Sequence, residues 1–220
     1  MSDDRAPVSL AARTYERLRA DLVAGRLPEG TKLRIDALRA RYGGVSLSPL
    51  REALSRLQSE HLVLGTAQRG WRVPPLSPEA MWDAIRVRTL LEGEALREAI
   101  ALGDDSWEVG MVAALHALRL AGRVGGDADE LERRHDAFHR SLLSGCRSRW
   151  LLELAALLSA QTRRYRLPAL ARTLSAGGRD LDGEHAGLLD AAIARDADLA
   201  CARLAAHYRR TGEEFAAAAG

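Results

Sequence analysis

Three prolines lie within five residues, at positions 74, 75 and 78, and they constrain the fold of this 220-residue chain more than any other feature. Proline cannot continue a helix or a central β-strand, because it lacks a backbone N–H and its ring fixes φ. We therefore expect a short, stiff linker over residues 76–79. The linker joins a first domain, residues 1–75, to a second domain, residues 80–220.

The first domain has the sequence pattern of three helices followed by a β-hairpin. Apolar residues recur at helical spacing in three segments, and glycines end the first two of them. Ser48 and Pro49 suit the cap and the first residue of the third helix. The expected elements are helices over 10–24, 35–42 and 48–60 and strands over 62–64 and 71–73. This order predicts a winged helix-turn-helix.

The charge of the first domain favours a nucleic-acid partner. Residues 1–75 carry 13 basic and 8 acidic residues, whereas the remainder carries 19 and 22, so only the front of the chain is basic. A winged helix-turn-helix brings the start of its last helix to base edges in the major groove of double-stranded DNA. The predicted DNA-contacting residues are Lys32, Arg34, Ser46, Leu47, Ser48, Arg51, Gln68, Arg69 and Gly70. The alternative is a small helical module that docks on another protein.

The second domain reads as helix throughout. Apolar residues at spacings of three and four, such as Leu90, Leu91, Leu96 and Ile100, alternate with glycine-containing breaks. The expected helices are 78–102, 105–122, 128–145, 147–166, 179–194 and 197–216. Helices of this number and length form an antiparallel bundle with room for a pocket. The predicted fold class is therefore mainly α, a winged helix-turn-helix followed by an all-α bundle.

Four histidines are placed to meet inside that bundle. His135 and His139 are four residues apart and project from one helix face. His185 and His207 lie about equally far from the turn near Arg195, so an antiparallel hairpin brings them level. Four imidazoles suit Zn²⁺, Ni²⁺ or another borderline divalent metal. The alternative is that they are ordinary core histidines, and Asp136 is expected to be an exposed carboxylate.

Arginines in the second domain indicate a ligand with a carboxylate group. Arg88 lies among apolar residues, and Arg164 and Tyr165 belong to an arginine-rich segment at the end of one helix. Arginine binds carboxylates in a bidentate manner, so Arg88, Arg164 and Tyr165 are the predicted effector-binding residues. Alternatively these arginines pair with acidic neighbours such as Glu92. A metal-dependent hydrolase or lyase is a second functional hypothesis, although the chain has no HExxH motif and no phosphate-binding glycine loop.

The chain carries no apolar segment long enough to span a bilayer and no apolar signal segment near its N-terminus. Its two cysteines, Cys146 and Cys201, do not form a disulfide framework. We expect a cytoplasmic protein without a membrane partner.

Several motifs resemble those of the GntR family of bacterial transcription regulators. The matching stretches of the first domain are residues 25–33, GRLPEGTKL, and residues 48–57, SPLREALSRL. The second domain resembles the FCD ligand-binding domain of the FadR subfamily, on residues 87–92, VRTLLE, and 138–143, FHRSLL, and on Glu184-His185 followed 22 residues later by His207. Within this group, His135 to His139 and the segment 161–166 resemble the CsiR/GlaR branch.

The resemblance implies a homodimer that binds a palindromic operator and responds to a small effector. By resemblance, His139, His185 and His207 match three metal ligands of the FCD domain, and His135 stands where many members have an aspartate. The expected ion is zinc, with nickel or manganese as alternatives. Arg88 matches an arginine of the effector pocket. Leu47 replaces an arginine common at the start of the recognition helix, and the preceding turn is one residue longer than usual.

The branch implies control of the catabolism of glutarate and related short dicarboxylates. The function expected from the resemblance is therefore a repressor that a small carboxylate such as glutarate releases from its operator. An activator built from the same parts is an open alternative, because the sign of regulation depends on where the operator lies.

Overall fold

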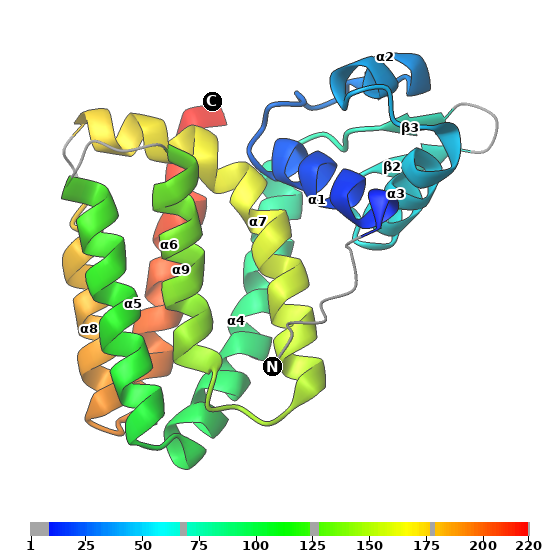
Figure 1. The fold of residues 1–220 in the computed structure, drawn as a ribbon. Helices are drawn as coiled ribbons and strands as arrows, with labels where there is room; N and C mark the ends of the chain where they lie inside the picture. The colour runs from blue at the N-terminus through cyan, green and yellow to red at the C-terminus, as the bar shows by residue number, and fades with distance from the viewer. Residues whose placement is uncertain (1–8, 67–69, 124–127, 177–178, 220) are drawn as a thin grey trace, which may run out of the picture. The chain divides into compact units, whose positions relative to one another are not determined.

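The computed structural model describes residues 9–66, 70–123, 128–176 and 179–219, and it divides into two compact units, Met1–Leu76 and Ser77–Gly220 (Figure 1). The boundary falls inside the proline-rich segment. Pro74 and Pro75 lie outside any helix, whereas Pro78 is the first residue of a helix whose N-cap, Ser77, accepts a hydrogen bond from the Ala80 N–H. Proline fits the first helical position because the N–H there has no partner within the helix.

The first unit packs three helices against a small antiparallel sheet. The helices are α1 (Leu10–Val23), α2 (Ile35–Arg41) and α3 (Leu47–Ser59), and the strands are β1 (Lys32–Leu33), β2 (Leu64–Thr66) and β3 (Gly70–Arg72). The strand order is β1-β3-β2. Leu18, Leu50, Leu54 and Leu57 are fully buried between α1 and α3 and form the centre of the core.

Two details of this unit differ from the sequence prediction. The hairpin strands lie one or two residues from the predicted positions, because Leu62, Val63 and Val73 are buried in the core beside the sheet rather than in it. The two-residue strand β1, which pairs Leu33 with Trp71, was not predicted. A strand so short carries no alternating pattern that sequence periodicity can detect.

The third helix begins earlier than predicted. Its N-cap is Ser46, not Ser48, and Leu47 is its first residue. Pro49 then lies in the third helical position, which it tolerates because the first N–H groups of a helix have no partner within the helix. The predicted cap at Ser48 is therefore wrong by two residues.

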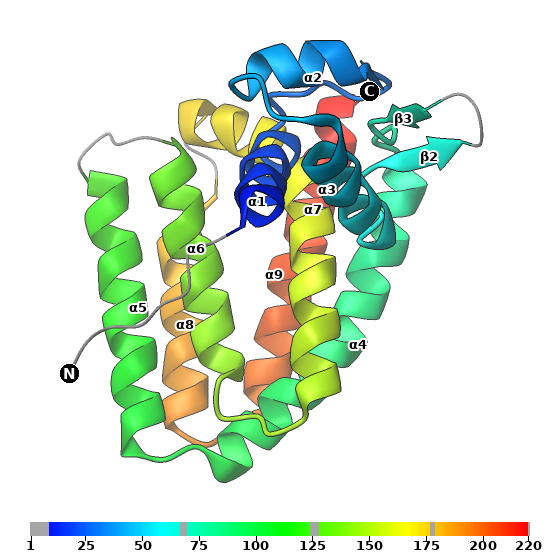
Figure 2. The same ribbon diagram turned by 45° about the vertical axis from the view of Figure 1, so that its right-hand side comes forward.

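The second unit is an antiparallel helical bundle. Its helices are α4 (Pro78–Leu102), α5 (Asp105–Arg123), α6 (Ala128–Leu143), α7 (Arg149–Ala176), α8 (Leu181–Ile193) and α9 (Ala197–Ala219). Helix α4 packs against α7 and α9, α5 packs against α6, and α8 packs against α9, as Figure 2 also shows. Phe138, Leu96 and Leu188 are among the fully buried side chains of this bundle. None of the described helices combines the length and apolar character that a membrane span needs.

Helix α7 extends ten residues beyond its predicted end. Its predicted end was residue 166, before Leu167-Pro168, but the helix continues through Pro168 to Ala176. A proline inside a helix costs about 3 kcal/mol or more, and packing elsewhere along a long helix offsets such a cost. The proline therefore did not mark the end of the helix.

Candidate metal centre and nucleic-acid interface

The structure brings the four predicted histidines together in the interior of the second unit. His135 and His139 come from α6, His185 from α8 and His207 from α9, and all four are at most 9% exposed. One ring nitrogen of each lies within 4.8 Å of those of the others. The i, i+4 spacing on α6 and the antiparallel α8–α9 pair produce this convergence.

The donor atoms of this cluster fit a divalent metal ion. Three buried ring nitrogens, His135 Nδ1, His139 Nε2 and His185 Nε2, have no hydrogen-bond partner among the described residues. Buried polar atoms without a partner are rare, and a metal ion is one of the groups that satisfies them. Four nitrogens around a tetrahedral zinc ion, each about 2.0–2.1 Å from the metal, lie about 3.4 Å from one another, so metal binding would draw the most widely separated ring nitrogens closer by about 1.4 Å.

The cluster is electrostatically suited to bind a cation. Burial lowers the pKa of His185 to about 3 and that of His207 to about 4, and it lowers the pKa values of His135 and His139 well below the usual range. All four imidazoles are therefore neutral at pH 7 and keep a nitrogen lone pair available for a metal.

In the metal-free protein, we expect the helical domain to lose stability in acid. The folded pKa of His207, about 4, lies below its unfolded value of 6.5, so the unfolded chain binds the proton first as the pH falls. The neutral, buried His207 therefore contributes on the order of 3 kcal/mol to the free energy of unfolding. This contribution is fully present above about pH 6.5 and is lost as the pH falls toward 4. The measurement is the urea midpoint of the metal-free protein between pH 7.5 and pH 4.5.

The matched variants are His207→Gln, which should lose part of this acid sensitivity, and His116→Ala, which should keep all of it. His116 is an exposed histidine on α5, outside the cluster. Equal pH profiles for the two variants would show that burial of His207 does not set the acid sensitivity.

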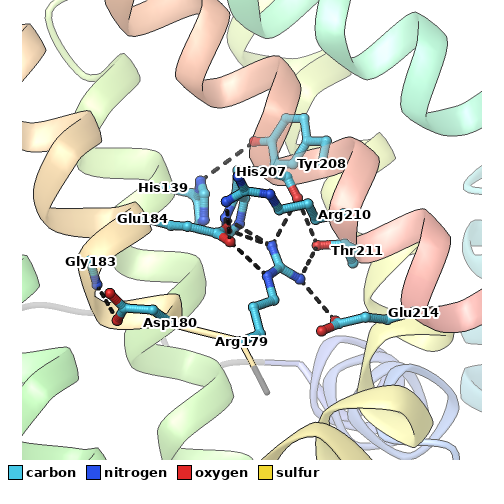
Figure 3. A network of polar contacts seen from close by, with 10 residues as sticks. All are labelled: His139, Arg179, Asp180, Gly183, Glu184, His207, Tyr208, Arg210, Thr211 and Glu214. Carbon is cyan, nitrogen blue, oxygen red and sulfur yellow. Dashed lines mark hydrogen bonds and ion pairs between the residues drawn. The ribbon is translucent and has the colours of Figure 1, made fainter. Parts of the chain in front are cut away.

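A network of charged side chains lies behind His207 (Figure 3). The His207 Nδ1 atom is 2.8 Å from a carboxylate oxygen of Glu184, and Glu184 also accepts hydrogen bonds from Arg179 and Arg210. Burial raises the pKa of Glu184, but hydrogen bonds from His207, Arg179 and Arg210 outweigh that effect and leave it well below the usual range. Glu184 is therefore an ionised acceptor. Its contact with His207 was not predicted, because Glu184 and His185 are adjacent on one helix and adjacent residues do not face the same point.

A cavity of about 440 Å³ opens onto the histidine cluster. His135, His185 and His207 form part of its wall, together with Arg166, Arg179 and three leucines, Leu118, Leu131 and Leu181. Arg166 pairs with Glu132, which is fully buried in the same wall. The cavity thus combines apolar surface, arginine and the histidine cluster, which is the composition of a site for a small organic anion.

The three predicted effector-binding residues do not line this cavity. Arg88 is buried and pairs with Glu92 at 2.5 Å, donates to Thr162 at 2.7 Å and stacks on the Tyr208 ring. Arg164 is buried, and Tyr165 packs edge-on against Phe215. Pairing of Arg88 with Glu92 was the alternative that the sequence left open. Asp136 lies near the same network, where it accepts a hydrogen bond from Ser159.

Arg166 and Arg179, the two arginines beside the histidines, were not among the predicted effector-binding residues. Arg166 belongs to the arginine-rich segment 161–166, but neighbouring positions on a helix cannot be ranked without knowing which face is buried. Arg179 was expected to begin the helix 179–194, whereas α8 begins at Leu181 and Arg179 precedes it.

The predicted DNA-contacting residues of the first unit are mostly exposed. Leu47, Ser48 and Arg51 lie on the outer face of α3, where Glu52 and Ser55, which were not predicted, border the same shallow hollow. The opposite face of α3 is buried. Glu52 is exposed on this face, and its carboxylate is of the kind that accepts hydrogen bonds from cytosine in the major groove.

The remaining predicted contacts lie on either side of α2 and in the hairpin. Ser46 caps α3, Lys32 is an exposed residue of β1 and Arg34 is the exposed N-cap of α2. Gly70 begins β3 with a positive φ of 79°, whereas Gln68 and Arg69 lie outside the described residues.

The turn between α2 and α3 depends on two consecutive glycines. Gly43 and Gly44 have φ angles of 79° and 74°, which other residues rarely adopt. The Arg39 Nε atom donates to the Val45 carbonyl across this turn, at 3.1 Å. This turn, which is one residue longer than is usual in the family that the sequence resembles, therefore has a defined geometry that fixes where α3 begins.

Comparison with known proteins adds independent evidence. Residues 10–73 match the family model described as bacterial regulatory proteins, gntR family, and residues 83–210 match that of the FCD domain. The chain is 40% identical to BphR, an HTH-type transcriptional regulator of Paraburkholderia xenovorans, over 86% of this chain and 78% of BphR. It is 35% identical to the HTH-type transcriptional repressor GlaR of Escherichia coli, over 83% of this chain and 84% of GlaR.

A solved structure shares the fold. That of McbR/YncC from Escherichia coli matches with a TM-score of 0.83 over 97% of this chain and 100% of that chain, at 22% identity. At this level of identity the similarity establishes the arrangement of helices and strands.

Proposed function

The chain belongs to the GntR family of transcription regulators and has an FCD domain, and from this premise we propose that it is a metal-dependent repressor of carboxylate catabolism. In this proposal a small carboxylate such as glutarate releases the protein from its operator. Family membership makes the chain a ligand-responsive, DNA-binding regulator rather than an enzyme, so the hydrolase or lyase hypothesis is set aside.

The DNA-binding part of the proposal rests on the exposed face of α3. One recognition helix covers few base pairs, so a homodimer on a palindromic operator supplies the two half-sites that specific binding needs. We assign DNA binding to residues 1–75 and dimerisation and effector binding to residues 80–220; of the expected linker, residues 76–79, the last two already belong to α4. A cytoplasmic location follows from this role.

The effector-binding part rests on one observation, four neutral buried imidazoles beside a cavity that also contains arginine. His135, His139, His185 and His207 would hold the divalent ion, with zinc expected and nickel or manganese as alternatives. When bound, the ion supplies a positive charge and a Lewis-acidic position that carboxylate oxygens occupy readily. Arg166 stands beside this position and orients a carboxylate, Arg179 adds positive charge to the same wall, and the leucines exclude water from the carbon chain of the effector. Arg88, Arg164 and Tyr165, the effector-binding residues expected from the sequence, do not line this cavity, so the proposal gives them no contact with the carboxylate.

Release from DNA requires that the effector binds one dimer geometry better than the other. Repression is favoured because the relative GlaR is named a repressor. An activator with the same two domains would differ only in where its operator lies relative to the promoter.

A gel shift tests this function directly. The purified protein is mixed with DNA from upstream of its own gene, with and without a panel of short mono- and dicarboxylates. We expect a specific shift that a dicarboxylate such as glutarate abolishes. A specific shift that no carboxylate affects would refute the effector class, and the absence of a shift at low salt would refute DNA binding by this surface.

We expect Arg51→Ala to weaken operator binding by about 30-fold or more, since a single base or phosphate contact contributes about 1–3 kcal/mol and a dimer loses two of them. Arg51 is exposed on α3, so the substitution should not alter stability. The control is Arg86→Ala on α4, which removes an exposed arginine paired only with Asp83 among the described residues. Equal operator affinity of the two variants would exclude Arg51 from the interface.

A further inference from the structure

We propose that Arg179 and Glu184 form a clamp that keeps the Nδ1 atom of His207 protonated, leaves its Nε2 atom for the metal, and thereby sets the metal affinity of the centre. The proposal rests on the proposed function only in assuming that the four histidines bind a divalent ion. It assigns these two residues a positioning role: they act on the metal through His207.

The contacts around His207 determine which of its ring nitrogens carries the proton. Glu184 receives hydrogen bonds from two arginines, so its carboxylate is ionised and can only accept. The His207 Nδ1 atom, 2.8 Å away, must then be the donor. The Arg179 Nη2 atom also lies 3.3 Å from Nδ1, but its two protons are directed to Glu184, at 2.7 Å, and to the His207 carbonyl, at 3.0 Å, so Nδ1 is not its acceptor. A neutral imidazole that is protonated at Nδ1 offers Nε2 as its lone-pair nitrogen.

The position of Glu184, on α8, is fixed by Arg179, and Arg179 is in turn bound to α9. Arg179 donates to both of its oxygens, at 3.0 and 2.7 Å, in a bidentate arrangement. The same guanidinium donates to Glu214 at 2.8 Å, to Thr211 at 3.2 Å and to the backbone carbonyl of His207 at 3.0 Å, all on α9 (Figure 3). The position of Glu184 relative to the His207 ring is therefore fixed by several bonds rather than one.

This arrangement distinguishes His207 from the other three histidines. Among the described residues, it is the only member of the cluster whose ring nitrogen contacts a carboxylate. A carboxylate behind a metal-bound histidine fixes the ring, raises its basicity as a ligand and strengthens metal binding, and removing such a partner typically costs about 10- to 100-fold in affinity.

Glu184 lies outside the 440 Å³ cavity, as does Asp190, another carboxylate of α8. Asp190 is exposed, and among the described residues it forms no hydrogen bond or ion pair with a histidine. The two carboxylates therefore form a matched pair: each substitution removes one negative charge from α8, but only that at Glu184 removes the partner of His207.

The experiment measures zinc affinity of the full-length, metal-free protein against a competing chromophoric chelator. We expect Glu184→Ala to bind zinc about 10- to 100-fold more weakly than the wild type, and Asp190→Ala to stay within about 3-fold of it. Glu184→Gln, which keeps an acceptor and the side-chain volume, should fall between them and serves if the alanine variant does not fold. Equal affinities of Glu184→Ala and Asp190→Ala overturn the proposal.

Nitrogen NMR of the histidine side chains gives a second readout that does not depend on metal. In the metal-free wild type, His207 should show a protonated Nδ1 and an unprotonated Nε2, and Glu184→Gln should weaken this preference. A wild-type His207 protonated at Nε2 contradicts the clamp, even if zinc binds. A wild type that takes up no zinc refutes the metal site of the proposed function, and the proposal with it.

Discussion

The His139→Ala variant is expected to lose carboxylate-dependent release from operator DNA while keeping its fold and its affinity for that DNA. His139 is 4% exposed and supplies one of the four converging imidazoles. Loss of a ligand should weaken metal binding by more than the roughly 10- to 100-fold that an outer partner costs. The proposed DNA-contacting residues lie in the other unit of the chain, so we expect the substitution to leave them intact.

The measurement is a titration of the preformed protein–operator complex with glutarate, with His116→Ala as the control variant. His116→Ala also removes a histidine, but an exposed one outside the cluster. Release at the wild-type glutarate concentration from the His139→Ala complex would show that the histidine cluster has no part in the response.

The second large effect is expected at the buried Arg88–Glu92 pair. Both side chains are 3% exposed, and Glu92 also accepts a hydrogen bond from Tyr208. Burial lowers the pKa of Arg88, but Glu92 outweighs this effect and keeps that pKa above its usual value. Glu92→Met therefore leaves a charged guanidinium in the core without its counter-ion, and we expect it to destabilise the helical domain by about 3–5 kcal/mol.

A double variant distinguishes the effect of the unpaired charge on stability from the effect of altered packing. Arg88→Met/Glu92→Met removes both charges and should recover much of the lost stability, because a buried ion pair replaced by apolar residues of similar size is often near neutral. Urea denaturation can follow tryptophan fluorescence in a Trp71→Phe background, since the other tryptophans, at positions 82, 107 and 150, lie in the helical unit. If the double variant is as unstable as Glu92→Met, the unpaired charge is not the cause.

The sequence was sufficient to predict the histidine cluster, and the reason is geometric. Residues four apart on a helix share a face, and residues equidistant from the turn of an antiparallel pair lie level. Both rules depend only on spacing, so His135, His139, His185 and His207 could be placed together before the fold was known. The winged helix-turn-helix was predictable for the same reason, since its order of elements follows from local periodicity and glycine positions.

The arginines show where this reasoning fails. Their side chains are long, and their partners come from distant parts of the chain, so sequence spacing does not say which acid they meet. Arg88 pairs with Glu92 one turn away and also bonds to Thr162 on another helix, whereas Arg179 contacts Glu184 and Glu214. Charge patterns indicated a carboxylate ligand, but only tertiary structure shows that Arg166 and Arg179 stand at the cavity.

The central claim is that the histidine-bound metal couples a carboxylate to release from DNA. The most direct test measures the operator affinity of one protein preparation in metal-free form and in zinc-loaded form, each with and without glutarate. The account predicts that glutarate weakens operator binding of the zinc-loaded protein and leaves the metal-free protein unaffected. Equal weakening of both forms, or a zinc-loaded protein that stays on its operator with every carboxylate of the panel, would contradict it.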